Sequence, residues 1–136
     1  MVSEEWLSKQ FEGIVQNSGF SIIFKSHNES PDFILSHKGR KIGAELKVGT
    51  SPKSLSIAIG QLLFGKVAFN LDDLWLVLPD VRNPLLSISK EWFSVMISCN
   101  IKLLSIQDNI LVEMKNDMLK PSRRAKSINN YLNMLL

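Results

Sequence analysis

The strongest constraint on the fold of this chain is an alternation of apolar and polar residues over positions 42–48. The apolar positions are Ile42, Ala44, Leu46 and Val48. The intervening positions are Gly43, Glu45 and Lys47. Because successive side chains of a β-strand point to opposite faces, this pattern predicts a strand with one face in the core. Its other face gathers a carboxylate and an amine beside a glycine that leaves space.

A second predicted strand precedes this one and forms a hairpin with it. Pro31-Asp32 opens the stretch, and Lys38-Gly39 supplies a turn that glycine makes easy. The hairpin over residues 31–47 therefore carries Asp32 at the start of one strand and Glu45 and Lys47 on the next. Two carboxylates and an amine so placed can bind a hard divalent cation and position a water.

The chain before the hairpin predicts a helix and a strand. Ser3 can cap a helix whose apolar residues recur at helical spacing, and Gly19 ends it in a C-terminal capping position. The apolar residues of this helix are Leu7, Phe11, Ile14 and Val15. Residues 20–24 then predict a short buried strand.

A long apolar helix is predicted directly after the hairpin. Gly49-Thr50-Ser51-Pro52 is a turn and helix-start signal. The apolar positions that follow are Leu55, Ile57, Ala58, Ile59, Leu62, Leu63, Phe64 and Val67. A stripe this broad is typical of a helix that is largely buried.

The next segments predict a strand, a helix and a second hairpin. Residues 74–78 form a short apolar run of the kind found at the centre of a sheet. Ser89 can cap a helix that ends at about Ser98. Residues 101–106 and 110–115 then predict a hairpin.

Near the C-terminus, apolar residues at i, i+3, i+4 and i+7 predict a final amphipathic helix. These residues are Ile128, Tyr131, Leu132 and Leu135. The complete predicted order is helix, three strands, helix, strand, helix, hairpin and helix. At 136 residues the chain is long enough for one domain and too short for two, so residues 1–136 are predicted to form one α/β domain.

In its motifs and its order of elements, the chain resembles the PD-(D/E)XK nuclease family, which has the restriction-endonuclease-like fold. The motif is carried by Pro31-Asp32 and Glu45-Leu46-Lys47. The first six predicted elements, roughly residues 4–79, match the αβββαβ core of that family. The resemblance implies a central mixed sheet flanked by helices, to which this chain adds a C-terminal hairpin and helix.

The resemblance also implies a role for each motif residue. Asp32 and Glu45 are expected to bind Mg²⁺, for which Mn²⁺ can substitute, and the backbone carbonyl of Leu46 is expected to contact the metal. Such a metal makes a water nucleophilic and relieves charge on the phosphoryl oxygens. Lys47 is expected to orient or deprotonate that water, and it can also act electrostatically without giving up its proton.

Gln61 is a further candidate for the catalytic site. It is a polar amide among apolar neighbours on the helix after the hairpin, where a polar group usually has a partner. Holliday junction resolvases and RecB-like nucleases, two branches of the resembled family, place a glutamine on this helix near the site. Some carry it as Gln-x-x-x-Tyr, whereas here the fourth residue on is Gly65. The alternative is a glutamine at the helix edge that bonds to backbone or water.

The resembled family often adds a glutamate from the first helix as a further ligand or ligand support. Glu12 is the closer match, and Glu5, seven residues earlier, shares its face of the helix. In the alternative, neither takes part. Glu4 and Glu5 can also simply favour the helix N-terminus through its dipole.

Other chemistries lack their sequence signals. His27 and His37 are ten residues apart with no Cys or His partner at zinc spacing, and no phosphate-loop or dinucleotide fingerprint is present. The N-terminus lacks the basic start and apolar core of a signal peptide, and no apolar run approaches the roughly 20 residues of a membrane span. We therefore expect a cytoplasmic protein with no membrane partner.

The charge pattern suggests where nucleic acid would bind. The net charge of +3 fits a polyanion partner without demanding one. Lys53 flanks the helix after the hairpin, and Lys120, Arg123, Arg124 and Lys126 precede the final helix. A positive charge is poorly placed at a helix start, and a phosphate contact would explain it. Any one of these residues can instead be a solvated surface charge.

Three functions follow from these patterns. The first is a Mg²⁺-dependent DNA endonuclease, either Holliday junction resolvase-like or a small restriction, homing or nicking enzyme. The DNA substrates of these enzymes usually require two active sites. We therefore expect a homodimer whose interface is formed by the final helix or by the apolar residues near Trp92 and Phe93. The second is a non-catalytic nucleic-acid-binding or assembly subunit that retains the nuclease fold. The third is an unrelated α/β interaction domain in which the motif is accidental.

Overall fold

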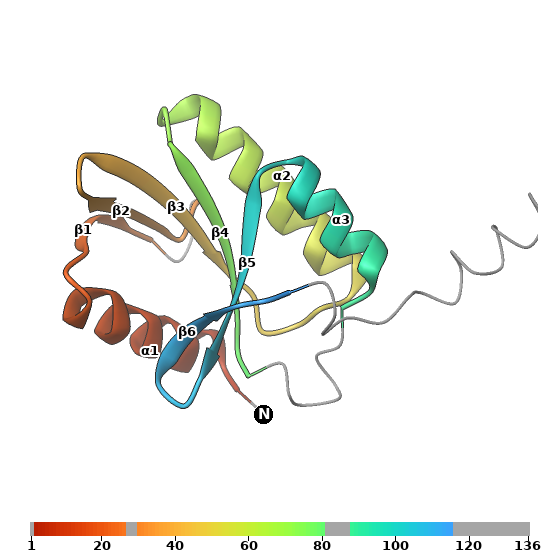
Figure 1. Ribbon diagram of the computed structural model, residues 1–136, viewed down its shortest axis with the longest axis horizontal. Helices are drawn as coiled ribbons and strands as arrows, with labels where there is room; N and C mark the ends of the chain where they lie inside the picture. Colours follow the sequence, from red (N-terminus) through yellow and green to blue (C-terminus); the bar gives the residue numbers. More distant parts are fainter. Residues whose placement is uncertain (1, 27–29, 81–87, 116–136) are drawn as a thin grey trace, which may run out of the picture.

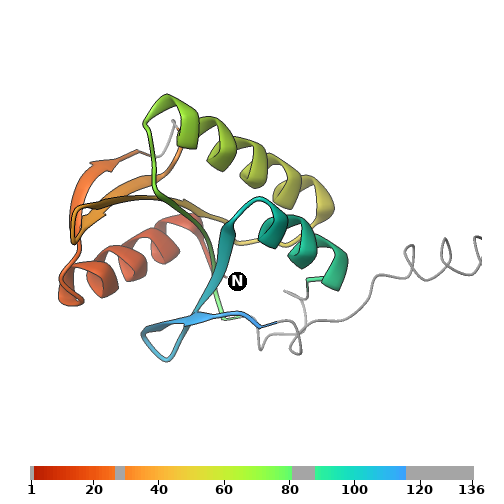
Figure 2. The ribbon, with the colours of Figure 1, turned by 45° about the horizontal axis from the view of Figure 1, so that its top comes forward.

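The computed structural model describes residues 2–26, 30–80 and 88–115. Its elements, in chain order, are α1 (Glu4–Asn17), β1 (Ser21–Lys25), β2 (Phe33–His37), β3 (Arg40–Leu46), α2 (Pro52–Ala68), β4 (Asp73–Leu78), α3 (Lys90–Ser98), β5 (Ile101–Gln107) and β6 (Ile110–Glu113). The strands form one sheet, which α1 covers on one face and α2 and α3 cover on the other (Figures 1 and 2). The predicted final helix and the residues Arg123, Arg124 and Lys126 lie outside the described residues.

The sheet is mixed, and its strands lie in sequence order from β1 to β6. β3, β4 and β5 run parallel to one another at its centre, while β1, β2 and β6 pair antiparallel with their neighbours. The predicted α/β fold class, an αβββαβ core followed by a helix and a hairpin, is therefore confirmed.

Local sequence signals set the starts of the helices and the turns of the hairpins. The side chains of Ser3, Ser51 and Ser89 each cap a helix by accepting a hydrogen bond from a backbone N–H three residues on. In both hairpin turns two successive residues have positive φ, Lys38-Gly39 in one and Asp108-Asn109 in the other. These turns match the right-handed twist of the strands that they join, so each hairpin closes within two residues.

The alternation along β3 sends its side chains to two different cores. Ile42, Ala44 and Leu46 pack on the α1 side of the sheet. Gly43 and Glu45 occupy the alternate positions of the strand and therefore face α2. The prediction that Gly43 leaves space is wrong, because a Cβ at Gly43 would collide with the Leu71 side chain and contact that of Pro31.

Two burial predictions are also wrong. β1 was expected to be buried, but its residues are exposed or half-buried because β1 is an edge strand that pairs only with β2. α2 was expected to be largely buried, yet Ile57, Phe64 and Val67 are exposed. The apolar residues of α2 lie on all sides of the helix. The sheet can cover only one of these sides, so the others stay exposed.

Candidate active site

Asp32 and Glu45 meet at the C-terminal end of β3. β2 and β3 are antiparallel with Phe33 opposite Ala44, so the residue before β2 comes to lie beside the end of β3. The backbone N–H of Leu46 donates to Oδ2 of Asp32 at 2.8 Å. The Glu45 carboxyl, when protonated, donates a hydrogen bond to the Asp32 carboxylate. The hairpin thus brings together two acids that are 13 positions apart in the sequence.

Glu45 lies in a row of buried side chains that crosses the centre of the sheet. The strand registers place it beside Leu76 of β4, which in turn lies beside Leu103 of β5. The exposed fractions of these residues are 2% for Glu45, 0% for Leu76 and 1% for Leu103. A carboxylate in this position loses most of its hydration, which disfavours its charged form.

The pKa values of both acids respond to this environment. Burial, followed by the charge of Asp32, raises the pKa of Glu45 to about 8, although a hydrogen bond from Ser30 and the charge of Lys47 oppose this increase. Burial also raises the pKa of Asp32, against the hydrogen bond from Leu46 and the charge of Lys47. Because the pKa values of both acids are raised and Glu45 donates to Asp32, the two carboxyl groups share a proton at neutral pH.

Two buried oxygen atoms near this row lack partners. Oε1 of Glu45 and Oε1 of Gln61 are inaccessible to solvent and accept no hydrogen bond from the described residues. A Cβ on Gly65, one helical turn after Gln61, would lie 3.2 Å from Pro31, which Gly43 of β3 also approaches. Because Gln61 lies one turn before Gly65 and Glu45 lies two residues after Gly43, both face the same α2–β3 interface. Buried polar atoms without partners are rare and call for a missing ligand or water.

The N-terminal glutamate beside the site is Glu4. A cavity of about 30 Å³ next to Asp32 is lined by Glu4, Ser8, Ser26, Asp32 and Leu46. The charge of Glu4 also contributes to the raised pKa of Asp32. A single water needs roughly 10–15 Å³ of such space, so the cavity has room for a small ion with a water.

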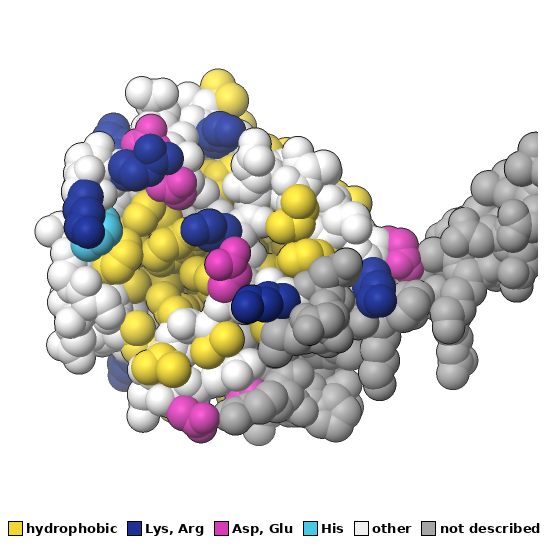
Figure 3. Space-filling model, in the orientation of Figure 1, with side chains coloured by type: hydrophobic (Ala, Val, Ile, Leu, Met, Phe, Trp, Pro, Cys, Tyr) yellow, Lys and Arg dark blue, Asp and Glu magenta, His cyan; other side chains and the backbone are white. Residues whose placement is uncertain are grey.

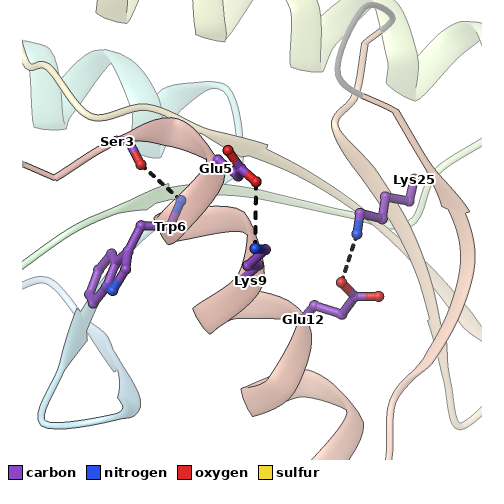
Figure 4. Close-up of polar contacts among 6 residues, drawn as sticks. All are labelled: Ser3, Glu5, Trp6, Lys9, Glu12 and Lys25. Carbon is purple, nitrogen blue, oxygen red and sulfur yellow. Dashed lines mark hydrogen bonds and ion pairs between the residues drawn. The ribbon is translucent and has the colours of Figure 1, made fainter.

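The structure places Glu5 and Glu12, the two predicted glutamates, elsewhere. Glu12 forms an ion pair with Lys25 at 2.7 Å, and Glu5 pairs with Lys9 at 3.5 Å (Figure 4). Neither lines the cavity beside Asp32. One sequence signal could have identified Glu4: it stands four residues before Ser8, which α1 buries on its core face together with Leu7, Phe11 and Val15.

Lys47 lies near the acidic pair, and Lys53 follows it in the chain. Lys47 is half-buried, its backbone N–H donates to the carbonyl of Val77 at 3.0 Å, and its charge lowers the pKa of both Asp32 and Glu45. Lys53 is exposed in the first turn of α2, shortly after the end of β3. A positive charge beside the acids and another at the surface suit a site that holds a polyanion.

The donor set fits a hard divalent cation held by few protein ligands. Among the described residues, no group of three or more His, Cys, Asp or Glu side chains is arranged to hold a metal ion. Magnesium, however, is usually bound by one or two carboxylates and keeps several waters. Asp32, Glu45 with its unpartnered oxygen and the adjoining main chain provide such a set.

A larger hollow lies away from the acids. It has a volume of about 790 Å³ between α1 and the strands β4, β5 and β6, and Figure 3 shows its apolar floor. Trp75, Phe20 and Leu104 are among the residues that line it, and its charged members are Lys9, Lys102 and Glu113. Glu113 is the one carboxylate in its lining, so this hollow lacks the paired acids found beside Asp32.

Comparison with known proteins supports the fold assignment alone. No family model matches the chain, and no curated protein matches it. Among solved structures it resembles an fdxN element excision controlling factor protein from Anabaena variabilis (TM-score 0.58, 13% identity, 79% of this chain and 97% of that one). It also resembles SfsA of Pyrococcus furiosus in complex with Ca²⁺ (0.54, 14%, 90% and 66%) and a repair endonuclease from Pyrococcus abyssi (0.52, 17%, 76% and 47%). No helix in the described part of the chain is long and apolar enough to cross a membrane.

Proposed function

We propose that this protein is a metal-dependent DNA endonuclease of the PD-(D/E)XK type. The observation that carries the proposal is the buried pair of Asp32 and Glu45, which share a hydrogen bond while one Glu45 oxygen has no partner among the described residues. Burying ionisable groups in this way costs stability, and such costs concentrate at functional sites. The likeness of the fold to a repair endonuclease, and to a protein solved with Ca²⁺, agrees with this assignment.

In the proposed reaction, Asp32 and Glu45 hold Mg²⁺, with Mn²⁺ as a substitute, and the carbonyl of Leu46 completes the protein ligands. Bound Mg²⁺ supplies positive charge for the phosphoryl oxygens and lowers the pKa of a coordinated water. Glu45 must lose its proton to act as a ligand, and the nearby charge of Lys47 favours that loss.

Lys47 is the residue that acts on the attacking water and on the developing negative charge. Lys47 directly follows the end of β3, and its charge lowers the pKa of both Asp32 and Glu45, so we propose that its ammonium group acts beside these acids. Fixed positive charge in a partly buried site stabilises a phosphoryl transition state without reorganisation. The carboxylate of Glu4, which lines the cavity beside Asp32, and the buried amide of Gln61 are the groups that we propose orient waters around the site.

We propose a junction-resolving, restriction, homing or nicking enzyme as the kind of endonuclease. Cleavage of both strands of a duplex or junction requires two active sites, so the proposed functional unit is a homodimer. Lys53 and the basic cluster of Arg123, Arg124 and Lys126 are the proposed contacts to the DNA backbone.

A non-catalytic nucleic-acid-binding or assembly subunit is the second candidate. The specific observation in its favour is that Glu45 is almost completely buried, while the cavity next to Asp32 has a volume of only about 30 Å³. The description of the Anabaena neighbour as an excision controlling factor is also compatible with a role in an assembly.

Two measurements separate these candidates. The first is cleavage of plasmid, linear and four-way-junction DNA with and without Mg²⁺, by the parent and by Asp32→Asn. Asp73→Asn is the matched control, because Asp73 pairs with Arg40 at the opposite end of β4. The second is the melting temperature at pH 8.5 as Mg²⁺ is added, which should rise for the parent and not for Asp32→Asn.

Cleavage that requires Mg²⁺ and Asp32 would establish the enzyme. A rise in melting temperature without cleavage, together with DNA binding, would favour the non-catalytic subunit. If Mg²⁺ neither raises the melting temperature nor supports cleavage, the proposed endonuclease fails; if the chain also binds no DNA, the nucleic-acid-binding subunit fails as well.

A further inference from the structure

The outward surface of α2 is apolar, although α2 already buries its opposite side in the core. Leu55, Ala58, Ile59 and Leu62 are the large or medium side chains that it buries. On the outward side the exposed fractions are 45% for Ile57, 69% for Phe64 and 86% for Val67. No charged residue stands between Lys53 and Lys66. A helix that is apolar on all sides is normally buried on all sides, so its outward side lacks a partner in the described chain.

We propose that this outward surface pairs with the same surface of a second copy of the chain. The α2 stripe, as we call it, consists of Ile57, Gly60, Phe64 and Val67. Residues at i, i+3, i+7 and i+10 lie along one side of a helix, and these span about 15 Å. In Figures 1 and 2, α2 lies at the edge of the molecule with α3 on one side of it, and the exposed fractions of Ile57, Phe64 and Val67 place the stripe on the surface.

The stripe is complementary to itself, as a two-fold interface requires. A Cβ at Gly60 would meet no atom within 4 Å, so Gly60 forms a gap on the helix surface. Phe64, one turn later, protrudes. If two α2 helices pack antiparallel about an axis at the level of Leu62, Phe64 of each copy lies against Gly60 of the other.

The same axis also pairs the ends of the stripe. Ile57 and Val67 are each five residues from Leu62, just as Gly60 and Phe64 are each two residues from it. A single antiparallel arrangement therefore places Phe64 against Gly60 and also places Ile57 against Val67. A different protein partner would have no reason to produce this symmetry, whereas a two-fold dimer demands it.

Of the two surfaces expected from sequence to form a dimer, the one near Trp92 and Phe93 lies in the described chain. Phe93 is buried in the core on the α2 side of the sheet, and Trp92 packs against that core. The predicted final helix lies outside the described residues. An uncharged, apolar helix surface is also typical of stable homodimer interfaces, whose core is depleted of charge.

Sedimentation of the full chain tests the proposal directly. We expect a dimer with twice the 15.4 kDa mass of one chain. Phe64→Glu should raise the dissociation constant at least ten-fold while the helix content stays constant, because the side chain is largely exposed in one copy. Ile110→Glu is the matched control: it changes an equally exposed apolar residue on β6 and should leave the dimer intact.

Gly60→Leu tests the packing of Phe64 against Gly60. The substitution favours the helix of a single copy, since glycine is a poor helix former, but it fills the gap that receives Phe64. We therefore expect a higher melting temperature at concentrations where the chain is monomeric, together with a dissociation constant raised at least ten-fold.

Disulfide trapping tests the register in a Cys99→Ser background. A mixture of Ile57→Cys and Val67→Cys chains should cross-link more than either variant alone. A monomeric parent, a Phe64→Glu variant that remains a dimer, or a tighter Gly60→Leu dimer would each overturn the proposal. Because these readouts are mass and cross-linking, their outcome is independent of whether the protein cleaves DNA.

Discussion

β3 and β5 occupy equivalent places on either side of β4, yet the polar side chains that they bury differ in charge and in hydrogen bonding. Both run parallel to β4, and both bury polar side chains toward their C-terminal ends. On β5 the buried groups are neutral and bonded, since Ser105 donates to the carbonyl of Pro79 at 2.9 Å and Gln107 contacts Ser105 at 3.5 Å. On β3 the buried group is the ionisable Glu45, and one of its oxygens has no partner in the part of the chain that the structure describes.

This difference distinguishes a buried polar group that stabilises the fold from one that serves a functional site. A neutral group with a hydrogen bond costs little in a core, and it serves the fold without a ligand. An acid with an unpartnered oxygen destabilises the fold, and that cost is explained when a ligand completes the site. Four predictions test whether the two strands differ in this way.

The largest expected effect is on catalysis. Lys47→Ala should reduce Mg²⁺-dependent DNA cleavage by about 10²–10³-fold, because it removes the fixed positive charge beside the acids. DNA affinity should stay within a few-fold, since the loss concerns the transition state. Ser105→Ala on β5 should retain the parental cleavage rate per folded molecule. Equal losses in both variants would mean that the two strands do not differ in function.

The second prediction concerns folding stability. β3 has Gly43 where its neighbours in the same row have Leu74 and Ile101. Gly43→Ala should lower the free energy of unfolding by about 1–3 kcal/mol, because its Cβ collides with Leu71. Gly13→Ala in the exposed middle of α1, where a Cβ meets no atom within 4 Å, should instead raise it by up to about 1 kcal/mol. Urea unfolding measures the free energy of unfolding of both variants. If Gly43→Ala leaves this free energy unchanged, this side of β3 is not tightly packed.

The third prediction uses the pH dependence of stability without metal. The pKa of Glu45 is about 8 in the folded chain and near 4.5 when unfolded, so the folded state binds more protons between these values. The contribution of Glu45 is therefore fully present below pH 4.5 and is lost as the pH rises through 8. Glu45→Gln, which cannot ionise, should be more stable than the parent at pH 9 by about 1 kcal/mol or more, with a smaller advantage at pH 5.

Urea unfolding in a chelator at the two pH values measures this difference. Ser105→Ala provides the control, because it should change stability by the same amount at both pH values. A Glu45→Gln advantage that does not grow with pH would contradict a buried, protonated Glu45.

The smallest expected effect is on DNA affinity. Lys53→Ala should weaken binding a few-fold and reduce the slope of its logarithmic salt dependence by about one, because Lys53 is exposed close to the end of β3. Lys102→Ala on β5, which lines the hollow on the α1 side, should change neither quantity. Fluorescence anisotropy at several salt concentrations distinguishes the two variants, and equal effects would place the DNA elsewhere.

Much of the fold could be predicted because its signals are local. The serine caps, the two-residue hairpin turns and the alternation of β3 each depend on residues that are close in sequence. The same locality explains why the acids were identified, since a tight hairpin fixes Asp32 beside Glu45 whatever surrounds it. The roles of Asp32, Glu45 and Lys47 in catalysis stay predictions until they are measured.

The parts that sequence could not decide depend on which surfaces meet. Glu4, Glu5 and Glu12 all belong to one helix. Only the docking of α1 against the sheet brings Glu4 near Asp32 and lets Glu12 form an ion pair with Lys25. In the same way, the apolar pattern of α2 shows that several sides avoid water, but not which side the sheet covers.

The sequence by itself determined the order of elements, the hairpin that joins the two acids and the apolar character of α2, because each follows from short-range geometry and side-chain chemistry. Only the tertiary structure decided that Glu45 lies in a row with Leu76 and Leu103, and that Ile57, Phe64 and Val67 face outward. The reason is that burial depends on strand register and helix docking between segments distant in the chain. Loss of hydration sets both the raised pKa of Glu45 and the apolar surface offered by α2, and it arises only when those segments pack together.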